Sequence, residues 1–394
     1  MRIVIAPDSY KGSLSAVAVT AAVERGLLSV FPAADIHKVP IADGGEGTVE
    51  ALTTATGGQI LQETVTGPLG DPVEAFWGVL GDSETAVIEM AAASGLTLVP
   101  ESKRDPRFTT TYGTGQLIKA VLDRGLRNII IGIGGSATND GGAGMLQALG
   151  AVFLDTAGEC LPQGGAALAR LAAIELSGLD RRLAETTIQV ACDVDNPLCG
   201  PKGASAVYGP QKGATPEMVG QLDNALEKYA AIAQAATGKN VSACPGAGAA
   251  GGLGAGLLFF TKAQLRPGVE IVLEATGFTD IVKNADLVIT GEGRTDFQTA
   301  FGKAPVGVAK IAQLYRVPVI CLSGGLGKDH EAVLTQGIDG LMSIVPQPMA
   351  LEECVRSADK LVEQAAARLG RLLLTGMTVQ KRLNRGLYAN AAMP

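Results

Sequence analysis

The sequence predicts an α/β protein of two domains, in which a parallel sheet of Rossmann-like or flavodoxin-like type accepts a second α/β domain with a mixed sheet as an insertion. Near both ends of the chain, short apolar runs alternate with amphipathic helical segments, a pattern typical of a parallel sheet. Between them, short alternating runs separated by Gly-Pro and Gly-Asp turns indicate antiparallel strands. The 394 residues are enough for two hydrophobic cores.

The first domain is expected to combine residues 1–56 with residues 280–394, and the inserted domain to span residues 57–279. In the first domain, alternating strands and helices predict one five-stranded parallel sheet, with strands near residues 3, 37, 287, 320 and 343. Ser13 is the expected N-cap of a helix that ends at Leu28. A single helix over residues 352–374 is expected to close the chain.

The inserted domain is expected to contain a mixed sheet covered by helices. Its strands are predicted over residues 60–65, 73–80, 85–90, 152–154, 174–176 and 188–191. The β-branched run at Ile129 could join either sheet. Helices are predicted over residues 112–124 and 216–237, the second with Thr215 as its cap and Pro216 at its first position.

A glycine-rich run over residues 246–256 contains a GxGxxG pattern. No hydrophobic strand precedes it, so the run lacks the context of a dinucleotide-binding motif. We expect a flexible hinge or a close backbone approach between the domains instead. Helices are expected over residues 257–265 and 271–276.

Composition excludes several classes of protein. The net charge is −7 and no long basic block is present, which argues against nucleic-acid binding. The longest uncharged stretch, residues 240–261, is rich in glycine and contains Pro245, so it would span a membrane poorly. The six cysteines show no CxxC spacing and only two histidines are present, which argues against a zinc site. Free thiols and an N-terminus without signal-peptide features favour the cytoplasm.

A strand, a glycine loop and the start of a helix follow one another over residues 129–149. This arrangement aims backbone N–H groups at an anion such as phosphate or carboxylate. Gly134, Gly135, Ser136 and Thr138 could supply the N–H and hydroxyl donors, and Asp140 could hold a metal or receive a proton. The alternative is an ordinary tight turn with Asp140 as the helix N-cap.

The same pattern, a strand end followed by carboxylates, cations or hydroxyls among glycines, recurs at six places. They are Asp8 with Lys11; Asp43, Gly44, Gly45 and Glu46; residues 134–140; Asp193 with Asn196; Glu292, Arg294, Asp296 and Lys303; and Ser323 with Gly324. Carboxylates and cations beside phosphate cradles are what Mg²⁺-dependent phosphoryl transfer requires. No Walker A motif, protein-kinase motif set or GxSxG motif is present.

Five of these segments resemble those of the bacterial type-1 glycerate kinases: residues 6–14, 42–48, 134–142, 192–198 and 290–296. They occur in order over nearly the whole chain, with Tyr10 where the family often has Phe. The resemblance implies transfer of the ATP γ-phosphoryl group to D-glycerate with Mg²⁺, and an active site in the cleft between two α/β domains. The usual product is 2-phosphoglycerate, and 3-phosphoglycerate is the alternative. A homodimer is compatible with the sequence, which does not fix the oligomeric state.

Roles for the site residues are hypotheses. Lys11 and Arg294 would neutralise phosphate or the glycerate carboxylate. Asp193 is the first choice for the base that accepts the hydroxyl proton, and Asp43 the second. Glu292 and Asp296 would contact the metal or the ribose. The remaining candidates would contact substrate or phosphate: Asp8, Gly44, Gly45, Glu46, Gly134, Gly135, Ser136, Thr138, Asp140, Asn196, Lys303, Ser323 and Gly324.

Two other classes of protein stay open at this point. A non-catalytic protein that binds sugar acids needs only one anion pocket, whereas several carboxylate-bearing loops are present. A phosphosugar isomerase or a dehydrogenase is disfavoured because the nucleotide fingerprint is missing and histidine is scarce.

Overall fold

The computed structural model describes residues 1–391, with side chains as far as Asn384. The chain forms two compact units, Met1–Ile41 with Thr276–Pro394, and Ala42–Ala275. The boundaries therefore lie earlier than the expected 56/57 and 279/280. The helix α2 (Thr48–Thr56), which the sequence analysis assigned to the first domain, packs on strands of the second unit.

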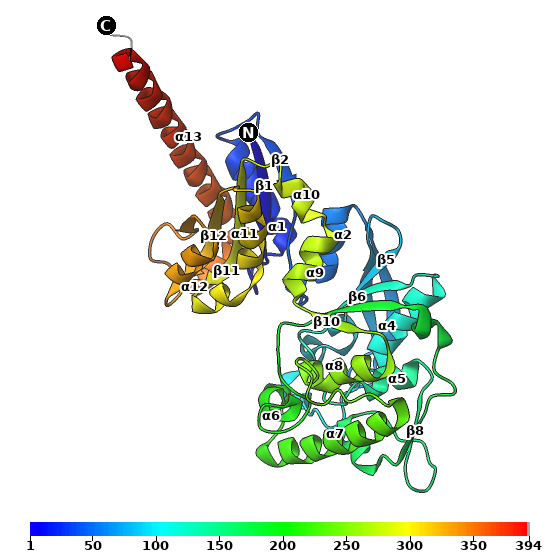
Figure 1. The fold of residues 1–394 in the computed structure, drawn as a ribbon. Helices are drawn as coiled ribbons and strands as arrows, with labels where there is room; N and C mark the ends of the chain where they lie inside the picture. Colours follow the sequence, from blue (N-terminus) through cyan, green and yellow to red (C-terminus); the bar gives the residue numbers. More distant parts are fainter. Residues whose placement is uncertain (392–394) are drawn as a thin grey trace. The chain divides into compact units, whose positions relative to one another are not determined.

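The first unit contains one five-stranded sheet in the order β13-β12-β11-β1-β2 (Figure 1). Every neighbouring pair is parallel, which confirms the predicted sheet. Counted along the chain, this is the 2-1-3-4-5 order of flavodoxin-like sheets, whose topological switch point lies between β1 and β11. The strands are β1 (Arg2–Pro7), β2 (Asp35–Lys38), β11 (Leu287–Thr295), β12 (Val319–Leu326) and β13 (Gly340–Ser343).

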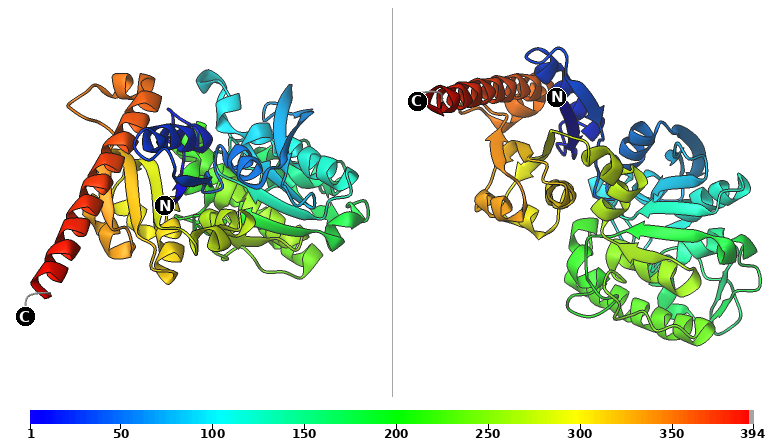
Figure 2. Two further views of the ribbon diagram at one scale, coloured as in Figure 1. Left: turned by 90° about the horizontal axis from the view of Figure 1, so that it is seen from above. Right: turned by 45° about the horizontal axis from the view of Figure 1, so that its top comes forward.

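Helices cover this sheet, and an apolar core forms beneath them. Helix α1 (Ala16–Leu28) packs against α13 (Ala358–Ala391), and both contribute to a core around Ile3, Ile5 and Ile289 (Figure 2). Helix α11 contacts β1, β11 and β12. The other elements of this unit are α10 (Phe278–Val282), α11 (Ala304–Leu314), α12 (Leu351–Arg356) and two 3-10 helices, Phe297–Phe301 and His330–Gln336.

Three predicted boundaries in this unit were wrong. Ser15, not Ser13, caps α1 through a hydrogen bond from Ala18 N, because the backbone of Tyr10 to Leu14 first closes a tight bridge. The closing helix is two helices that meet at Ser357. The segment predicted as a glycine loop after Thr290 continues β11, since it pairs with β12 as far as Thr295 and Leu326.

The second unit is built on a six-stranded mixed sheet in the order β10-β9-β6-β5-β4-β3. Strands β5, β6, β9 and β10 run parallel, and β3 and β4 complete the sheet antiparallel. The run at Ile129 is β6, in the interior of this sheet. The strands are β3 (Gln59–Thr66), β4 (Pro72–Val79), β5 (Thr85–Glu89), β6 (Asn128–Gly132), β9 (Thr187–Ala191) and β10 (Gln264–Arg266).

Two predicted strands do not join this sheet. β7 (Val152–Leu154) and β8 (Ala173–Glu175) form a separate antiparallel pair. They cannot extend β6, because β5 and β9 already occupy both of its edges. β10 was predicted as the end of a helix over residues 257–265 and is instead an edge strand.

Helices α4 (Tyr112–Asp123) and α7 (Pro216–Thr237) of the second unit closely match the helices predicted from the sequence. Helix α7 begins after Thr215, which accepts a hydrogen bond from Met218 N, and has Pro216 in its first turn, as predicted. The helices are α3 (Ala91–Ser94), α4 (Tyr112–Asp123), α5 (Ala143–Ala148), α6 (Ala204–Tyr208), α7 (Pro216–Thr237), α8 (Ala249–Phe260) and α9 (Gly268–Ala275). Among the described helices, none has both the length and the apolar character needed to cross a membrane.

The glycine-rich run is a packing element inside the second unit, so the prediction of an interdomain hinge or contact was wrong. Gly141 N donates to Gly251 O at 3.0 Å, and Gly248 N donates to Asn196 O at 2.9 Å. A Cβ on Gly251 would lie 2.0 Å from Thr138 O. The absent side chains thus let the kinked start of α8 lie directly on the loop that follows β6.

Candidate active site

The carboxyl ends of four parallel strands meet at one edge of the second unit. Glu89 of β5, Gly132 of β6, Ala191 of β9 and Arg266 of β10 are neighbours in register. The segments that follow these residues include two of the predicted site loops, residues 134–140 after β6 and Asp193 with Asn196 after β9. In open α/β sheets, ligands bind at this edge, so the predicted residues of this unit are brought to one region.

The loop of Asp43 is seated against these strand ends through glycines. Gly44 has φ +89°, and a Cβ there would lie 2.3 Å from the Cβ of Ala191. A Cβ on Gly132 would lie 2.2 Å from Gly44 O, and one on Gly268 would lie 1.9 Å from Asp43 O. Glycine is required at these positions because backbone atoms approach one another directly.

Two carboxylates lie close together at this edge. Asp193 Oδ1 accepts a hydrogen bond from Gly268 N at 2.8 Å, and Asp43 Oδ1 accepts one from Gly45 N at 2.9 Å. Partial withdrawal from water raises the pKa of Asp193, and the negative charges of Asp43 and Glu270 raise it further. A carboxylate with a raised pKa is suited to accept a proton near neutral pH.

The turn after β6 presents unused backbone donors. Gly134 and Gly135 are exposed, and Gly135 has φ +74°. In the described part of the chain, the N–H groups of Gly134, Gly135 and Ser136 have no acceptor. A Cβ on Gly134 would lie 3.2 Å from Gly45 Cα, so this turn adjoins the Asp43 loop. Successive free N–H groups around a left-handed residue form a concave site for an anion.

A buried lysine lies behind this turn, and sequence reasoning missed it. Lys212 Nζ donates to Ser136 Oγ at 2.8 Å and to Thr138 O at 2.6 Å. Burial lowers the pKa of Lys212 to about 7. Its segment, residues 202–213, is rich in Gly, Pro, Lys and Gln, which is typical of a solvated loop, so no local signal indicated burial.

Asp140 is fully buried and already saturated with donors. Its carboxylate accepts hydrogen bonds from the N–H groups of Thr111, Gly142 and Gly144 and from the Thr111 hydroxyl. The N-cap of α5 is Gly142, so the expectation of an Asp140 N-cap was wrong in detail. Asp140 instead ties the starts of α4 and α5 together, and this geometry favours a structural role over contact with phosphate.

Asn196 is also held by protein groups. Its Nδ2 donates to Lys202 O at 2.8 Å, and its Oδ1 accepts from the Tyr208 hydroxyl at 2.6 Å. Glu46 is exposed near the start of α2. Thr138 is fully buried, and its hydroxyl oxygen has no partner within the described residues.

The predicted residues of the first unit gather at the switch point between β1 and β11. Asp8 N donates to Gly291 O at 2.8 Å, and Asp8 Oδ1 accepts from Ser9 N at 2.6 Å. The backbone of Lys11 passes beside Gly293, whose Cβ would lie 3.3 Å from Lys11 N. The Lys11 side chain is exposed, so its charge is available to a ligand.

Glu292 belongs to a buried hydroxyl network. Its Oε1 accepts from Thr295 Oγ1 at 3.0 Å and from Thr299 Oγ1 at 2.7 Å. Burial raises the pKa of Glu292, and the nearby charge of Lys303 partly opposes that shift while Asp296 adds to it. Asp296 and Lys303 therefore both lie near Glu292.

The other candidates of this unit differ in exposure. Ser323 is fully buried, and its hydroxyl shares a hydrogen bond with Thr295 Oγ1 at 2.8 Å. Ser323 is therefore part of the network that holds Glu292, through Thr295. Arg294 is largely exposed, with its Nε 3.6 Å from Asp296 Oδ2. A Cβ on Gly324 would lie 2.3 Å from Gly293 O, so this glycine permits close strand packing.

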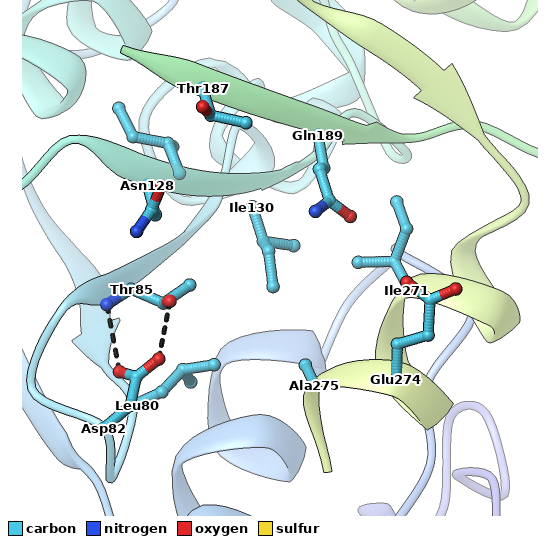
Figure 3. A pocket seen from close by; sticks show the side chains of 11 residues that line it. Leu80, Asp82, Thr85, Asn128, Ile130, Thr187, Gln189, Ile271, Glu274 and Ala275 are labelled. Carbon is cyan, nitrogen blue, oxygen red and sulfur yellow. Dashed lines mark hydrogen bonds between the residues drawn. The ribbon is translucent and has the colours of Figure 1, made fainter. Parts of the chain in front are cut away.

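Two cavities of the second unit are lined by residues other than the predicted ones, although the second includes Gly47 and Glu89, which adjoin the candidate site. One of about 270 Å³ opens near the amino ends of the strands, where Thr85, Asn128 and Thr187 line it and Glu274 approaches from α9 (Figure 3). Another of about 350 Å³, mostly apolar, lies beside the start of α2. None of the predicted site residues lines either cavity.

A family model described as the glycerate kinase family matches residues 3–374. The chain belongs to the glycerate kinase family. It is 58% identical over 366 residues to the glycerate kinase of Bacillus subtilis (strain 168), covering 93% of this chain and 96% of that protein. It is 52% identical over 377 residues to the glycerate 2-kinase of Escherichia coli (strain K12), covering 96% and 99% of the two chains.

A solved structure supports the same assignment for this glycerate kinase family member. The crystal structure of a candidate glycerate kinase 2 from Salmonella typhimurium LT2 has a TM-score of 0.88 and 52% identity, covering 96% of this chain and 99% of that one. The protein is therefore a kinase with the two-sheet α/β fold that the sequence predicted.

Proposed function

We propose that this protein transfers the γ-phosphoryl group of ATP to D-glycerate, giving 2-phospho-D-glycerate and ADP. Family membership supports the reaction class. The observation that carries the proposal is the edge of the six-stranded sheet, where Asp43 and Asp193 adjoin a turn with free N–H groups. A base and an anion site side by side are what a small hydroxy acid needs in order to be phosphorylated.

In this proposal Asp193 accepts the proton of the glycerate hydroxyl as that oxygen attacks the γ-phosphorus. The N–H groups of Gly134, Gly135 and Ser136 hold an anionic group of a substrate. We propose that the cluster of the first unit serves the same reaction. There, the exposed cations Lys11 and Arg294 neutralise phosphate or the glycerate carboxylate.

The reaction as proposed also uses Mg²⁺. In the described part of the chain, no group of three or more His, Cys, Asp or Glu side chains is arranged as a metal site. Mg²⁺ that arrives with ATP needs only one or two carboxylates besides phosphate and water, and the oxygens of Glu292 and Asp296 are ligands of the kind it prefers. When bound, the ion would neutralise charge on the phosphates. All six cysteines are free thiols, which suits the cytoplasm as the proposed location.

The proposal is tested by incubating the purified protein with ATP, Mg²⁺ and D-glycerate and measuring ADP. NMR of the product then distinguishes 2-phosphoglycerate from 3-phosphoglycerate. Glycerate-dependent ADP with the 2-phosphate supports the proposal, whereas the 3-phosphate would correct the regiochemistry. Tight glycerate binding without any ADP would instead favour a non-catalytic binding protein.

We expect Lys11→Ala to lower kcat/KM by about ten- to a hundredfold, because a charge-assisted hydrogen bond to a substrate anion contributes about 1.5–3 kcal/mol. Steady-state kinetics in both substrates measures the effect. Lys310→Ala, which removes an exposed lysine of the same unit on α11, is the matched control and should behave like the wild type. Unchanged kinetics in Lys11→Ala would assign Lys11 a structural role.

The pH dependence of kcat should reflect the protonation of the Asp193 carboxylate. A base acts as the carboxylate, so activity is lost as the pH falls through its pKa. The pKa of Asp193 is raised above the ordinary 3.8, so this loss should begin at a higher pH than for an unperturbed Asp. The measurement is a pH–rate profile at saturating substrates. A profile flat down to pH 4 in a folded protein would contradict the assignment.

A further inference from the structure

A buried ammonium group supports the Gly134–Ser136 turn from inside the protein. Lys212 is 1% exposed, and its Nζ donates to Ser136 Oγ and to the carbonyl oxygen of Thr138. The next residue, Gly213, has φ +96°, and a Cβ there would lie 2.3 Å from Arg104 O. This close approach fixes the segment that carries Lys212 against the rest of the unit.

The chemistry of the two partners decides the direction of the hydrogen bond. In its protonated form the Lys212 side chain has three N–H bonds and no lone pair, so this form can only donate. Ser136 Oγ therefore accepts from Lys212, and the single hydroxyl hydrogen of Ser136 stays available for a different acceptor. The N–H groups of the same turn have no acceptor in the described part of the chain either. One anion at the turn would satisfy all of these donors.

We infer that Lys212 is a positioning residue that makes the Ser136 hydroxyl a donor to the substrate anion bound by the Gly134–Ser136 turn. Lys212 acts through Ser136, because its own Nζ is enclosed by protein. The ligand chemistry is an anionic oxygen, which is a carboxylate in D-glycerate and a phosphate in ATP. The inference deepens the proposed function and rests on it for the identity of these substrates.

The electrostatic surroundings agree with this role. Asp140 lies near enough to raise the pKa of Lys212, but burial is the larger influence and lowers it. The Asp140 oxygens accept from Thr111, Gly142 and Gly144. Among the described residues, no carboxylate oxygen lies within 4.0 Å of Lys212 Nζ. A substrate anion at the turn would therefore complete the charge balance of a buried cation.

The experiment compares four forms of the full-length protein: wild type, Lys212→Met, Ser136→Ala and the double variant. Dissociation constants for D-glycerate and for ADP are measured separately by calorimetry, and KM and kcat are measured in the ADP assay. Each single variant should raise the dissociation constant of one of the two ligands by about tenfold or more. Because both variants act on one donor, the Ser136 hydroxyl, the double variant should bind that ligand no more weakly than the weaker-binding single variant.

Lys228→Met is the matched control. Lys228 is an exposed lysine of α7 that also donates to a backbone carbonyl, that of Ala169 at 2.9 Å. This variant should keep wild-type affinity for both ligands. Circular dichroism and thermal unfolding establish whether each variant is folded.

The affinity measurements show which anionic group binds at the turn. Loss of glycerate affinity places the carboxylate at the turn, and loss of ADP affinity places a phosphate there. Additive losses in the double variant, or unchanged affinity for both ligands in folded Ser136→Ala, overturn the inference. Ser136→Ala removes one hydroxyl and keeps Lys212, so it decides the matter even if Lys212→Met does not fold. Absence of glycerate-dependent ADP from the wild type would refute the proposed function, whereas coupled loss of anion binding would still support the role of Lys212.

Discussion

Asp193→Asn should lower kcat by about 100- to 10,000-fold and leave KM nearly unchanged, because the variant cannot accept the proton of the attacking hydroxyl. The amide oxygen of Asn can still accept the hydrogen bond that Gly268 N donates to Asp193 Oδ1, so the loop should keep its position. The loss should therefore concern the chemical step. Steady-state kinetics and circular dichroism of the same preparation measure activity and folding together.

Asp195→Asn is the matched control for this experiment. Asp195 is an exposed carboxylate two residues along the same loop. Its replacement makes the same change in net charge, and activity should stay close to that of the wild type. Near-normal turnover in folded Asp193→Asn would show that the base lies elsewhere, with Asp43 as the next residue to replace.

The second large effect concerns backbone packing at Gly44. Gly44→Ala should destabilise the protein by about 2–5 kcal/mol, of which about 1–2 kcal/mol is left-handed strain and the rest is overpacking. The added methyl group would lie 2.3 Å from the Cβ of Ala191. Because Asp43 precedes this residue, its carboxylate should move, and a displacement of about 1 Å can cost about a hundredfold in rate.

Gly47→Ala provides the comparison, because Gly47 has φ +90° but no atom within 4 Å of an added Cβ. The Gly47→Ala variant should be destabilised only by this backbone strain, about 1–2 kcal/mol, and it should keep most of its activity. Chemical denaturation and kinetics of the two variants separate backbone strain from close packing. Equal losses in both variants would show that contact with Ala191 has no energetic role.

The sequence predicted those features that depend on neighbouring residues. Helix α7 was placed correctly because Thr215 and Pro216 are local signals of a helix start. The parallel sheet of the first unit was predicted because β-branched runs alternate with amphipathic segments. Strand continuation through Gly291–Thr295 was missed, because it depends on pairing with β12, which is distant in the chain.

The residues of the candidate site likewise fall into those that local sequence signals predicted and those that depend on distant contacts. Glycine loops with carboxylates at strand ends identified Asp43 and Asp193, which the structure brings together at one edge. Lys212 gave no signal, because its burial results from contacts with residues more than 70 positions away. Ser323 was expected to contact substrate or phosphate and is buried, where its hydroxyl shares a hydrogen bond with Thr295 that no spacing rule describes.

The discontinuity of the first unit has a consequence for protein synthesis. When a ribosome has passed Ala275, every strand of the six-stranded sheet has been made, whereas only β1 and β2 of the five-stranded sheet exist. The unit that contains the N-terminus is thus completed last. Until β11 emerges, the apolar strand around Ile3 and Ile5 lacks its central partner. A nascent or truncated chain would therefore present an open edge to other chains and would be prone to aggregate.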